Sequence, residues 1–198
     1  MKFRIARLAA LLAALSGMPA LTFAQQPIVI RFSHVTASDT PKGQAAEYFK
    51  LLAEKNTKGR VRVDLFPNSQ LYKDKEELEA LHLGSVQMLA PSLSKFGPAG
   101  VKEFELFELP YLFSTYEDVH KITDGPIGAQ LLKKLETDGI LGLGYRDNGF
   151  RQMMANKAIH VPADFKGLKL RIVSAKITDA YTRAWGANPQ VMAFSEVY

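Results

Sequence analysis

After residue 26, the hydrophobic and polar positions follow strand and helix periods in turn. Apolar runs typical of strands lie at residues 28–34, 86–90, 140–146, 151–155 and 168–173. Residues 60–66 alternate between apolar and charged side chains, which predicts a half-buried strand near a sheet edge. Helical spacing of apolar residues covers residues 41–55, 127–135 and 175–185. Strands that alternate with helices predict an α/β fold with mainly parallel sheets.

Polar residues at the ends of these runs predict where helices and turns begin. Thr40 is expected to cap the helix that Pro41 opens, and Asp74 with Glu77 resembles a capping box for a helix that ends at Gly84. Asn188 and Pro189 are expected to turn the chain.

The last residues, 195–198, read as the first turn of a helix, and one turn is too short to be stable. Residues 149–198 hold too few elements for a core of their own. We therefore expect residues 27–148 to form a first α/β lobe and residues 149–198 to start a second, incomplete lobe. A frayed natural terminus is the alternative to truncation.

The first 24 residues have the pattern of a secretory signal peptide. Lys2, Arg4 and Arg7 precede a short apolar stretch, and Thr22 and Ala24 are small enough for the signal-peptidase pocket. The pattern predicts cleavage after residue 24 and export to the periplasm; an uncleaved membrane anchor is the alternative. The apolar stretch is shorter than the roughly 20 residues that a spanning helix needs.

The charge and the cysteine content narrow the function classes. The 25 basic and 20 acidic residues give a net charge of +5, and removing residues 1–24 leaves 22 basic against 20 acidic residues, or +2. So small an excess gives no support to nucleic-acid binding. With no cysteine in the chain, disulfides, thiolate nucleophiles and thiolate metal sites are excluded.

The motifs of common enzyme classes are absent from the sequence. It has no Gly-x-Ser-x-Gly elbow, no His-Glu-x-x-His pair and no phosphate-binding loop that ends in Lys-Ser/Thr. Its four histidines lie far apart, and no pair of carboxylates stands out as a general acid and base. The sequence therefore predicts no catalytic residues, no metal and no cofactor.

Cationic side chains at strand ends are the strongest candidates for ligand binding. Arg171 lies in the apolar run 168–173, where a charge is costly unless it meets a partner, and its guanidinium matches a carboxylate. The alternatives for Arg171 are an ion pair with a neighbouring acid or an outward-facing position. Arg151 opens the run 151–155, with a surface arginine as the alternative.

Further candidates follow the first and third strands, because ligands of α/β sheets bind beyond the carboxyl ends of strands. Ser92 and Lys95 follow the third strand, and His34 and Lys42 lie between the first strand and the start of the first helix. A helix N-terminus also attracts anions. Each of these residues could instead be an ordinary loop or surface residue, and Phe194 could be a core aromatic.

Eight segments in fixed order carry a family resemblance. They read RFSHV at 31–35, DTPKG at 39–43, FPNSQLY at 66–72, APSLSKF at 90–96, NGFRQ at 148–152, FKGLKLR at 165–171, GANP at 186–189 and FSEVY at 194–198. The chain resembles the DctP, C4-dicarboxylate-binding type of solute-binding protein from tripartite ATP-independent periplasmic (TRAP) transporters. The resemblance covers essentially all of the chain after the signal peptide.

The resemblance implies a two-lobed periplasmic-binding-protein-like fold that closes on an organic acid and delivers it to TRAP membrane permease subunits. It implies that Arg171 clamps the ligand carboxylate and that Arg151 is a second contact. Ser92 and Lys95 would contribute from the opposite lobe, and Phe194 would pack on the ligand. A serine at position 92 makes sialic acid doubtful. Ser92 with Lys95 suits a second carboxylate instead, which favours malate, succinate or fumarate. A monomer is expected, and an exported enzyme acting on an organic acid or phosphate ester stays open as the alternative.

Overall fold

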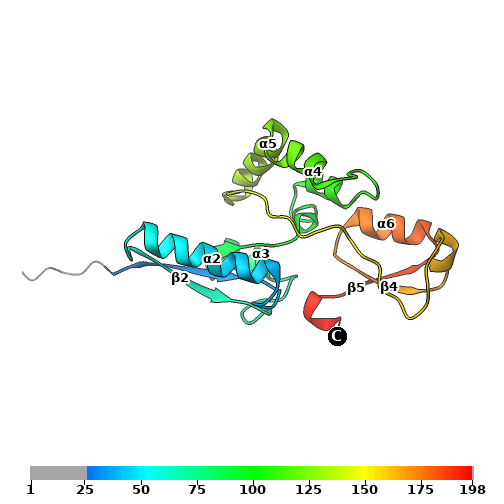
Figure 1. Ribbon diagram of the computed structural model, residues 1–198, viewed down its shortest axis with the longest axis horizontal. Coiled ribbons are helices and arrows are strands. Elements are labelled where there is room, and N and C mark those ends of the chain that lie inside the picture. The colour runs from blue at the N-terminus through cyan, green and yellow to red at the C-terminus, as the bar shows by residue number, and fades with distance from the viewer. Residues whose placement is uncertain (1–25, 198) are drawn as a thin grey trace, which may run out of the picture.

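The computed structural model describes residues 26–197, so the predicted signal peptide lies outside the described residues. The chain forms a three-stranded unit, a group of helices beside it and a smaller two-stranded unit (Figure 1). All strand pairs in both sheets are parallel, which confirms the predicted α/β class. No helix in residues 26–197 combines the length and hydropathy that a bilayer crossing requires.

The first unit is built around strand β1 (Ile28–Ser33). It lies between β2 (Val61–Phe66) and the short β3 (Met88–Leu89). Helix α2 (Pro41–Asn56) connects β1 to β2, and α3 (Glu77–His82) precedes β3. The predicted edge strand is confirmed, because β2 is outermost, with Val63 buried and Arg62 exposed.

The start of α2 is fixed by a cap and by a close approach of the backbone. The Thr40 hydroxyl accepts a hydrogen bond from the Gly43 amide at 3.1 Å, which confirms the predicted N-cap. A Cβ at Gly43 would lie 2.3 Å from the Ala37 carbonyl oxygen, so glycine allows the first turn to pack on the preceding loop. These contacts hold Lys42 at the carboxyl end of β1.

The helical group packs around Phe104, which is fully buried on the 3-10 segment η2 (Lys102–Glu108). Two helices, α4 (Tyr116–Thr123) and α5 (Pro126–Lys134), follow it in the chain. Phe96, at the end of η1 (Leu93–Phe96), packs against Phe104 with ring centroids 5.3 Å apart. The buried members of this cluster are Phe96, Val101, Phe104, Leu131, Leu135 and Ile140.

The second unit contains β4 (Lys169–Ile172), α6 (Lys176–Ala184) and β5 (Asn188–Val191), with β4 and β5 paired in parallel. Phe165 stacks on Trp185 at 4.9 Å between ring centroids. The predicted turn at Asn188 and Pro189 is wrong, because both residues begin β5. Proline is tolerated there since β5 is an edge strand.

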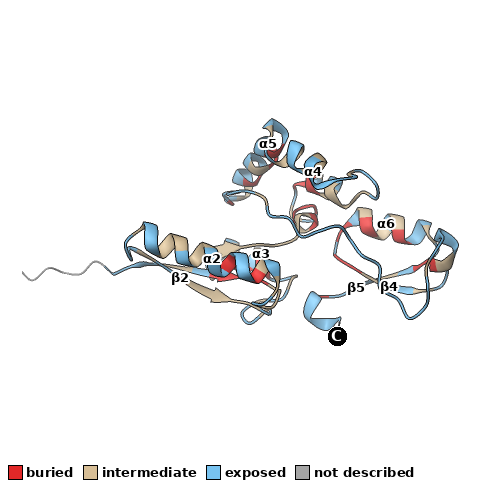
Figure 2. Cartoon of the chain, viewed as in Figure 1, coloured by how far each residue is buried: buried red, intermediate tan, exposed pale blue. Residues whose placement is uncertain are grey.

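Two other predicted strands are absent. Residues 140–146 and 151–155 form no strand, because no described segment hydrogen-bonds to them as a neighbour. Figure 2 shows residues 141–158 running mostly exposed between the units. Alternation and hydropathy predicted strands here, but a strand also requires a partner.

Two predicted helix starts are also wrong. Glu76 is the N-cap of α3 and makes no side-chain cap, while the Asp74 side chain points to the second unit. Near the end of the described residues, a 3-10 turn, η5 (Phe194–Glu196), begins one residue before the predicted cap, Ser195. The spacing of Asp74 and Glu77 predicts a helix cap, but the Asp74 carboxylate instead lies near Lys95 and Arg171, which are distant in the sequence.

Candidate functional site

A buried ion-pair cluster lies where η1 meets the loop before α3. The Lys95 Nζ is 3.0 Å from Glu77 Oε2 and 3.8 Å from Asp74 Oδ2. The side chains of Lys95, Glu77 and Asp74 are 10%, 1% and 11% exposed. A lysine this well buried needs such partners, because an isolated buried charge is costly.

The Glu77 carboxylate is almost completely buried, which disfavours its charged form. Burial raises the pKa of its carboxyl above the ordinary value, and the charge and hydrogen bond of Lys95 oppose this rise. With Lys95 in contact, the two groups form a buried ion pair. We infer that Glu77 and Lys95 hold each other in place, since removing one would leave the other buried without its counter-charge.

Arg171 approaches the same cluster from the second unit. Its Nε and Nη2 donate to the Met192 carbonyl at 3.2 and 3.0 Å, and its guanidinium carbon lies 5.9 Å from the centroid of the Phe194 ring. Its Nη2 is 3.6 Å from Asp74 Oδ2. An ion pair with an acid, one alternative that the sequence left open, is therefore present. Asp74 lies between Arg171 and Lys95.

Polar contacts beside Asp74 join the two units. The Phe194 amide donates to Asp74 Oδ2 at 3.2 Å, and Lys73 Nζ lies 3.0 Å from Glu196 Oε1. The exposed Lys73–Glu196 pair contributes little stability by itself. Together these contacts place the end of β5 against the loop before α3, so Arg171 of β4 and Lys95 of η1 both approach one carboxylate.

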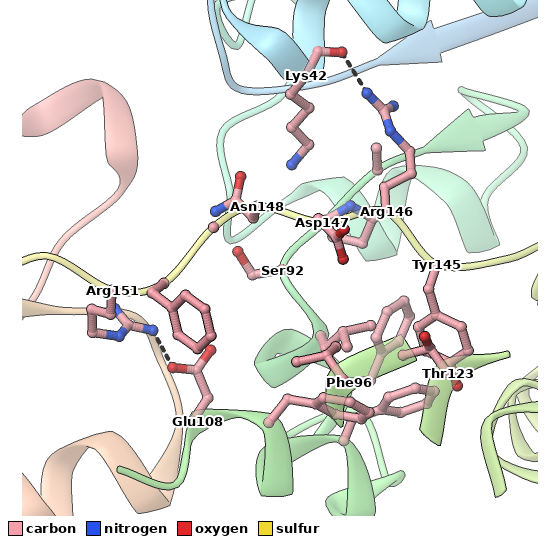
Figure 3. Close-up of a pocket in the computed structure, with 18 of the residues that line it drawn as sticks. Lys42, Ser92, Phe96, Glu108, Thr123, Tyr145, Arg146, Asp147, Asn148 and Arg151 are labelled. Carbon is pink, nitrogen blue, oxygen red and sulfur yellow. Dashed lines mark hydrogen bonds and ion pairs between the residues drawn. The ribbon is translucent and has the colours of Figure 1, made fainter. Parts of the chain in front are cut away.

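A second group of cations lies at the start of α2. The Arg146 guanidinium donates to the Lys42 carbonyl at 2.6 Å, and the Lys42 amine points into a pocket on the side where Ser92 and Asn148 lie (Figure 3). Burial lowers the pKa of Lys42; the charge of Glu77 opposes this, and the charges of Lys95 and Arg146 lower it further. The His34 ring is buried beside this group, with Nδ1 3.2 Å from Thr36 Oγ1.

Two expected site residues have contacts of their own. Arg151 forms an ion pair with Glu108, which lies at the end of η2 (Figure 3). Phe194 is partly exposed beside Arg171. The structure thus brings Arg171, Phe194 and Lys95 into one cluster and places Lys42, Ser92 and Arg151 along one pocket, with His34 buried near Lys42.

The sequence prediction missed four residues that neighbour these groups: Asp74, Glu77, Glu108 and Arg146. Asp74 and Glu77 carried the pattern of a helix cap, and the other two lay in segments without a recognised motif. Only the fold brings Asp74 and Arg171, which are 97 positions apart, into contact.

Two cavities accompany these clusters. One of about 420 Å³ is lined by Asp74, Lys95, Val173, Met192 and Ala193, among others. A broader pocket of about 1830 Å³ includes Lys42, Ser92, Arg146 and Arg151 in its lining. The smaller volume is within the range of small-molecule sites. Residues 26–197 contain no group of three or more His, Asp or Glu side chains placed to hold a metal ion.

His34 predicts a dependence of folding stability on pH. Burial, and then the charges of Lys42 and Arg146, lower its pKa from the ordinary value of 6.5, so the unfolded chain gains a proton at higher pH than the folded protein. Stability should therefore fall as the pH drops below about 6.5, by at most about 1.4 kcal/mol per pH unit for one such group. When the pH falls from 7 to 5, the free energy of unfolding should decrease less in the His34→Gln variant than in the wild type.

Urea unfolding at both pH values measures this difference. His120, whose pKa is raised by its hydrogen bond to Asp147, acts in the opposite direction but is unchanged in both proteins. The control for the substitution is His82→Gln, at an exposed histidine away from Lys42. Equal losses in the wild type and His34→Gln would contradict the prediction.

Comparison with known proteins places this geometry in a family. The model of the family "Bacterial extracellular solute-binding protein, family 7" (DctP) matches residues 32–198. A protein of Rhodobacter capsulatus called C4-dicarboxylate-binding periplasmic protein DctP is 60% identical over 194 residues, which cover 95% of this chain and 58% of that protein. This chain therefore spans less than two thirds of that relative.

Solved structures agree with this relationship. A TRAP periplasmic solute-binding protein from Sulfurospirillum deleyianum with bound succinate is 43% identical, with a TM-score of 0.83 over 86% of this chain and 55% of that one. One from Pseudomonas aeruginosa with bound L-malate is 42% identical, with a TM-score of 0.81 over 84% and 58%. By sequence and by fold, the chain belongs to family 7 of the bacterial extracellular solute-binding proteins.

Proposed function

We propose that this protein captures a C4-dicarboxylate such as malate, succinate or fumarate outside the cytoplasm and delivers it to the membrane subunits of a TRAP transporter. The proposal places it in the periplasm as a monomeric binding protein without a cofactor. The relatives named for C4-dicarboxylates, and the similar structures that hold succinate and malate, support this substrate class.

One observation carries the proposal. The Asp74 carboxylate, in the loop before α3, lies between Arg171 of the second unit and Lys95 of η1, at 3.6 and 3.8 Å. The meeting point of the units is therefore a place where cations accommodate a carboxylate. A ligand carboxylate bound beside Arg171 would bridge the units in the same way, and excluding water would strengthen each pairing.

The proposed residues have distinct roles. Arg171 binds one carboxylate, because the Met192 carbonyl and the Phe194 ring orient its planar guanidinium. Lys95 supplies positive charge from η1, where its contacts with Glu77 and Asp74 hold it. Phe194 packs on the ligand carbon chain. The remaining proposed contacts are Arg151, Ser92, Lys42 and His34.

The test is ligand binding by the full-length gene product. Thermal shift and titration calorimetry with succinate, L-malate and fumarate should show stabilisation, about 2.7 kcal/mol at a ligand concentration 100 times Kd. Butyrate, a C4 monocarboxylate, serves as the control and should stabilise far less. NMR of the incubated acids should show no turnover.

Two outcomes would overturn the proposed function. The first is that no C4-dicarboxylate changes the melting temperature or gives a heat of binding. The second is that an acid or a phosphate ester is consumed, which would indicate an exported enzyme.

A further inference from the structure

The charges around the site do not balance. The cations are Lys42, Lys95, Arg146 and Arg171. With Glu77 ionised against Lys95, the acids among the described residues that lie within 4 Å of any of them are Asp74 and Glu77. Lys95 is in contact with both acids, and Arg171 is in contact with Asp74. The excess of two positive charges belongs to Lys42 and Arg146, which we call the α2 cation pair.

Among the described residues, neither member of the α2 cation pair forms an ion pair with an acid. Among residues 26–197, no carboxylate oxygen lies within 4 Å of the Lys42 amine or the Arg146 guanidinium, whose hydrogen bond goes to the Lys42 carbonyl. The nearby Asp147 carboxylate contacts His120 instead. Burial lowers the pKa of Lys42 and of Arg146. The charge of Arg146 also lowers the pKa of Lys42, and both charges lower the pKa of His34. Two like charges held near each other, one of them half-buried, favour an anion between or beside them.

Neutral donors line the pocket into which the Lys42 amine points. Ser92 lines the same pocket, and its hydroxyl makes no side-chain cap to η1. The Asn148 side chain lies on the side to which the amine points (Figure 3). The pocket therefore presents a charged donor, a hydroxyl and an amide, which are groups that bind carboxylate oxygens.

We propose that Lys42 and Arg146 bind the second carboxylate of the ligand, and that Lys42 is the residue that selects dicarboxylates over monocarboxylates. This inference rests on the proposed function, in which Arg171 binds the first carboxylate. Lys95, by contrast, is committed to Glu77 and Asp74. Leu78 lines both the broad pocket that holds the α2 cation pair and the smaller cavity beside Asp74 and Lys95, so the pair lies next to the cluster that Arg171 joins.

The experiment compares succinate with succinamate, which has nearly the same shape but carries an amide in place of one carboxylate. Titration calorimetry on the full-length gene product should show that Lys42→Met weakens succinate binding about 10- to 100-fold and succinamate binding less than threefold. Arg146→Met should have the same pattern with a smaller loss. The matched control is Lys55→Met, at an exposed lysine in the last turn of the same helix, and it should bind like the wild type.

The melting temperature of the ligand-free protein gives an independent readout. Removing a half-buried cation that forms no ion pair among the described residues should leave the melting temperature nearly unchanged or raise it, whereas removing a lysine with an acid in direct contact would lower it. Equal losses for succinate and succinamate, or an unchanged succinate-to-succinamate ratio in both variants, would overturn the inference while leaving the proposed function intact. If the wild type binds neither succinate nor malate, the proposed function itself fails.

Discussion

Arg171→Lys should raise the Kd of the full-length gene product for malate and succinate by about 30-fold or more. The guanidinium can donate two parallel hydrogen bonds to a carboxylate, and a lysine amine is a point charge without that geometry. Removing one side of a desolvated, hydrogen-bonded charge pair costs about 2–5 kcal/mol, which corresponds to a factor of about 30 or more. Lysine would also lose the paired contacts of Nε and Nη2 with the Met192 carbonyl.

Titration calorimetry measures this effect, and the melting temperature of the ligand-free variant shows whether the fold is kept. Arg183→Lys is the matched control. It removes an arginine from an exposed pair with Asp179 on the surface of α6, so its Kd should equal that of the wild type. A Kd for Arg171→Lys within threefold of the wild-type value would remove Arg171 from the site.

Phe104→Ala should lower the free energy of unfolding by about 3–5 kcal/mol, because it deletes a fully buried aromatic side chain and leaves a cavity. The Phe104 ring packs against Phe96 and lies 6.4 Å from the Tyr145 ring, between centroids. A loss of this size is a large share of the 5–15 kcal/mol that stabilises a typical domain. Since Phe96 ends the segment that carries Lys95, ligand affinity should fall as well.

Urea unfolding followed by far-UV circular dichroism measures the loss. Tyr48→Ala is the control, because Tyr48 is an aromatic residue on α2 that is 63% exposed, and its removal should change stability by less than about 0.5 kcal/mol. A change below about 1 kcal/mol for Phe104→Ala would show that the helical group does not depend on this side chain.

The sequence predicted correctly those elements that are defined by contacts between residues close together in the chain. Thr40, Pro41 and Gly43 define the start of α2 through contacts within a few residues, and β2 shows its edge position by alternation. The segments that failed depend on distant partners. Residues 140–146 are apolar enough for a strand but pair with no described strand, and Pro189 was expected to turn the chain but pairs in register with Leu170.

The same division applies to the candidate site. The sequence by itself determined that the chain has cations after its strands, no cysteine and the ordered segments of a solute-binding family. Only the tertiary structure decided which charges meet: Asp74 lies between Arg171 and Lys95, while Lys42 and Arg146 remain without an acid among residues 26–197. The physical reason is that electrostatic interactions depend on separation in space and on burial, and neither follows from separation along the chain.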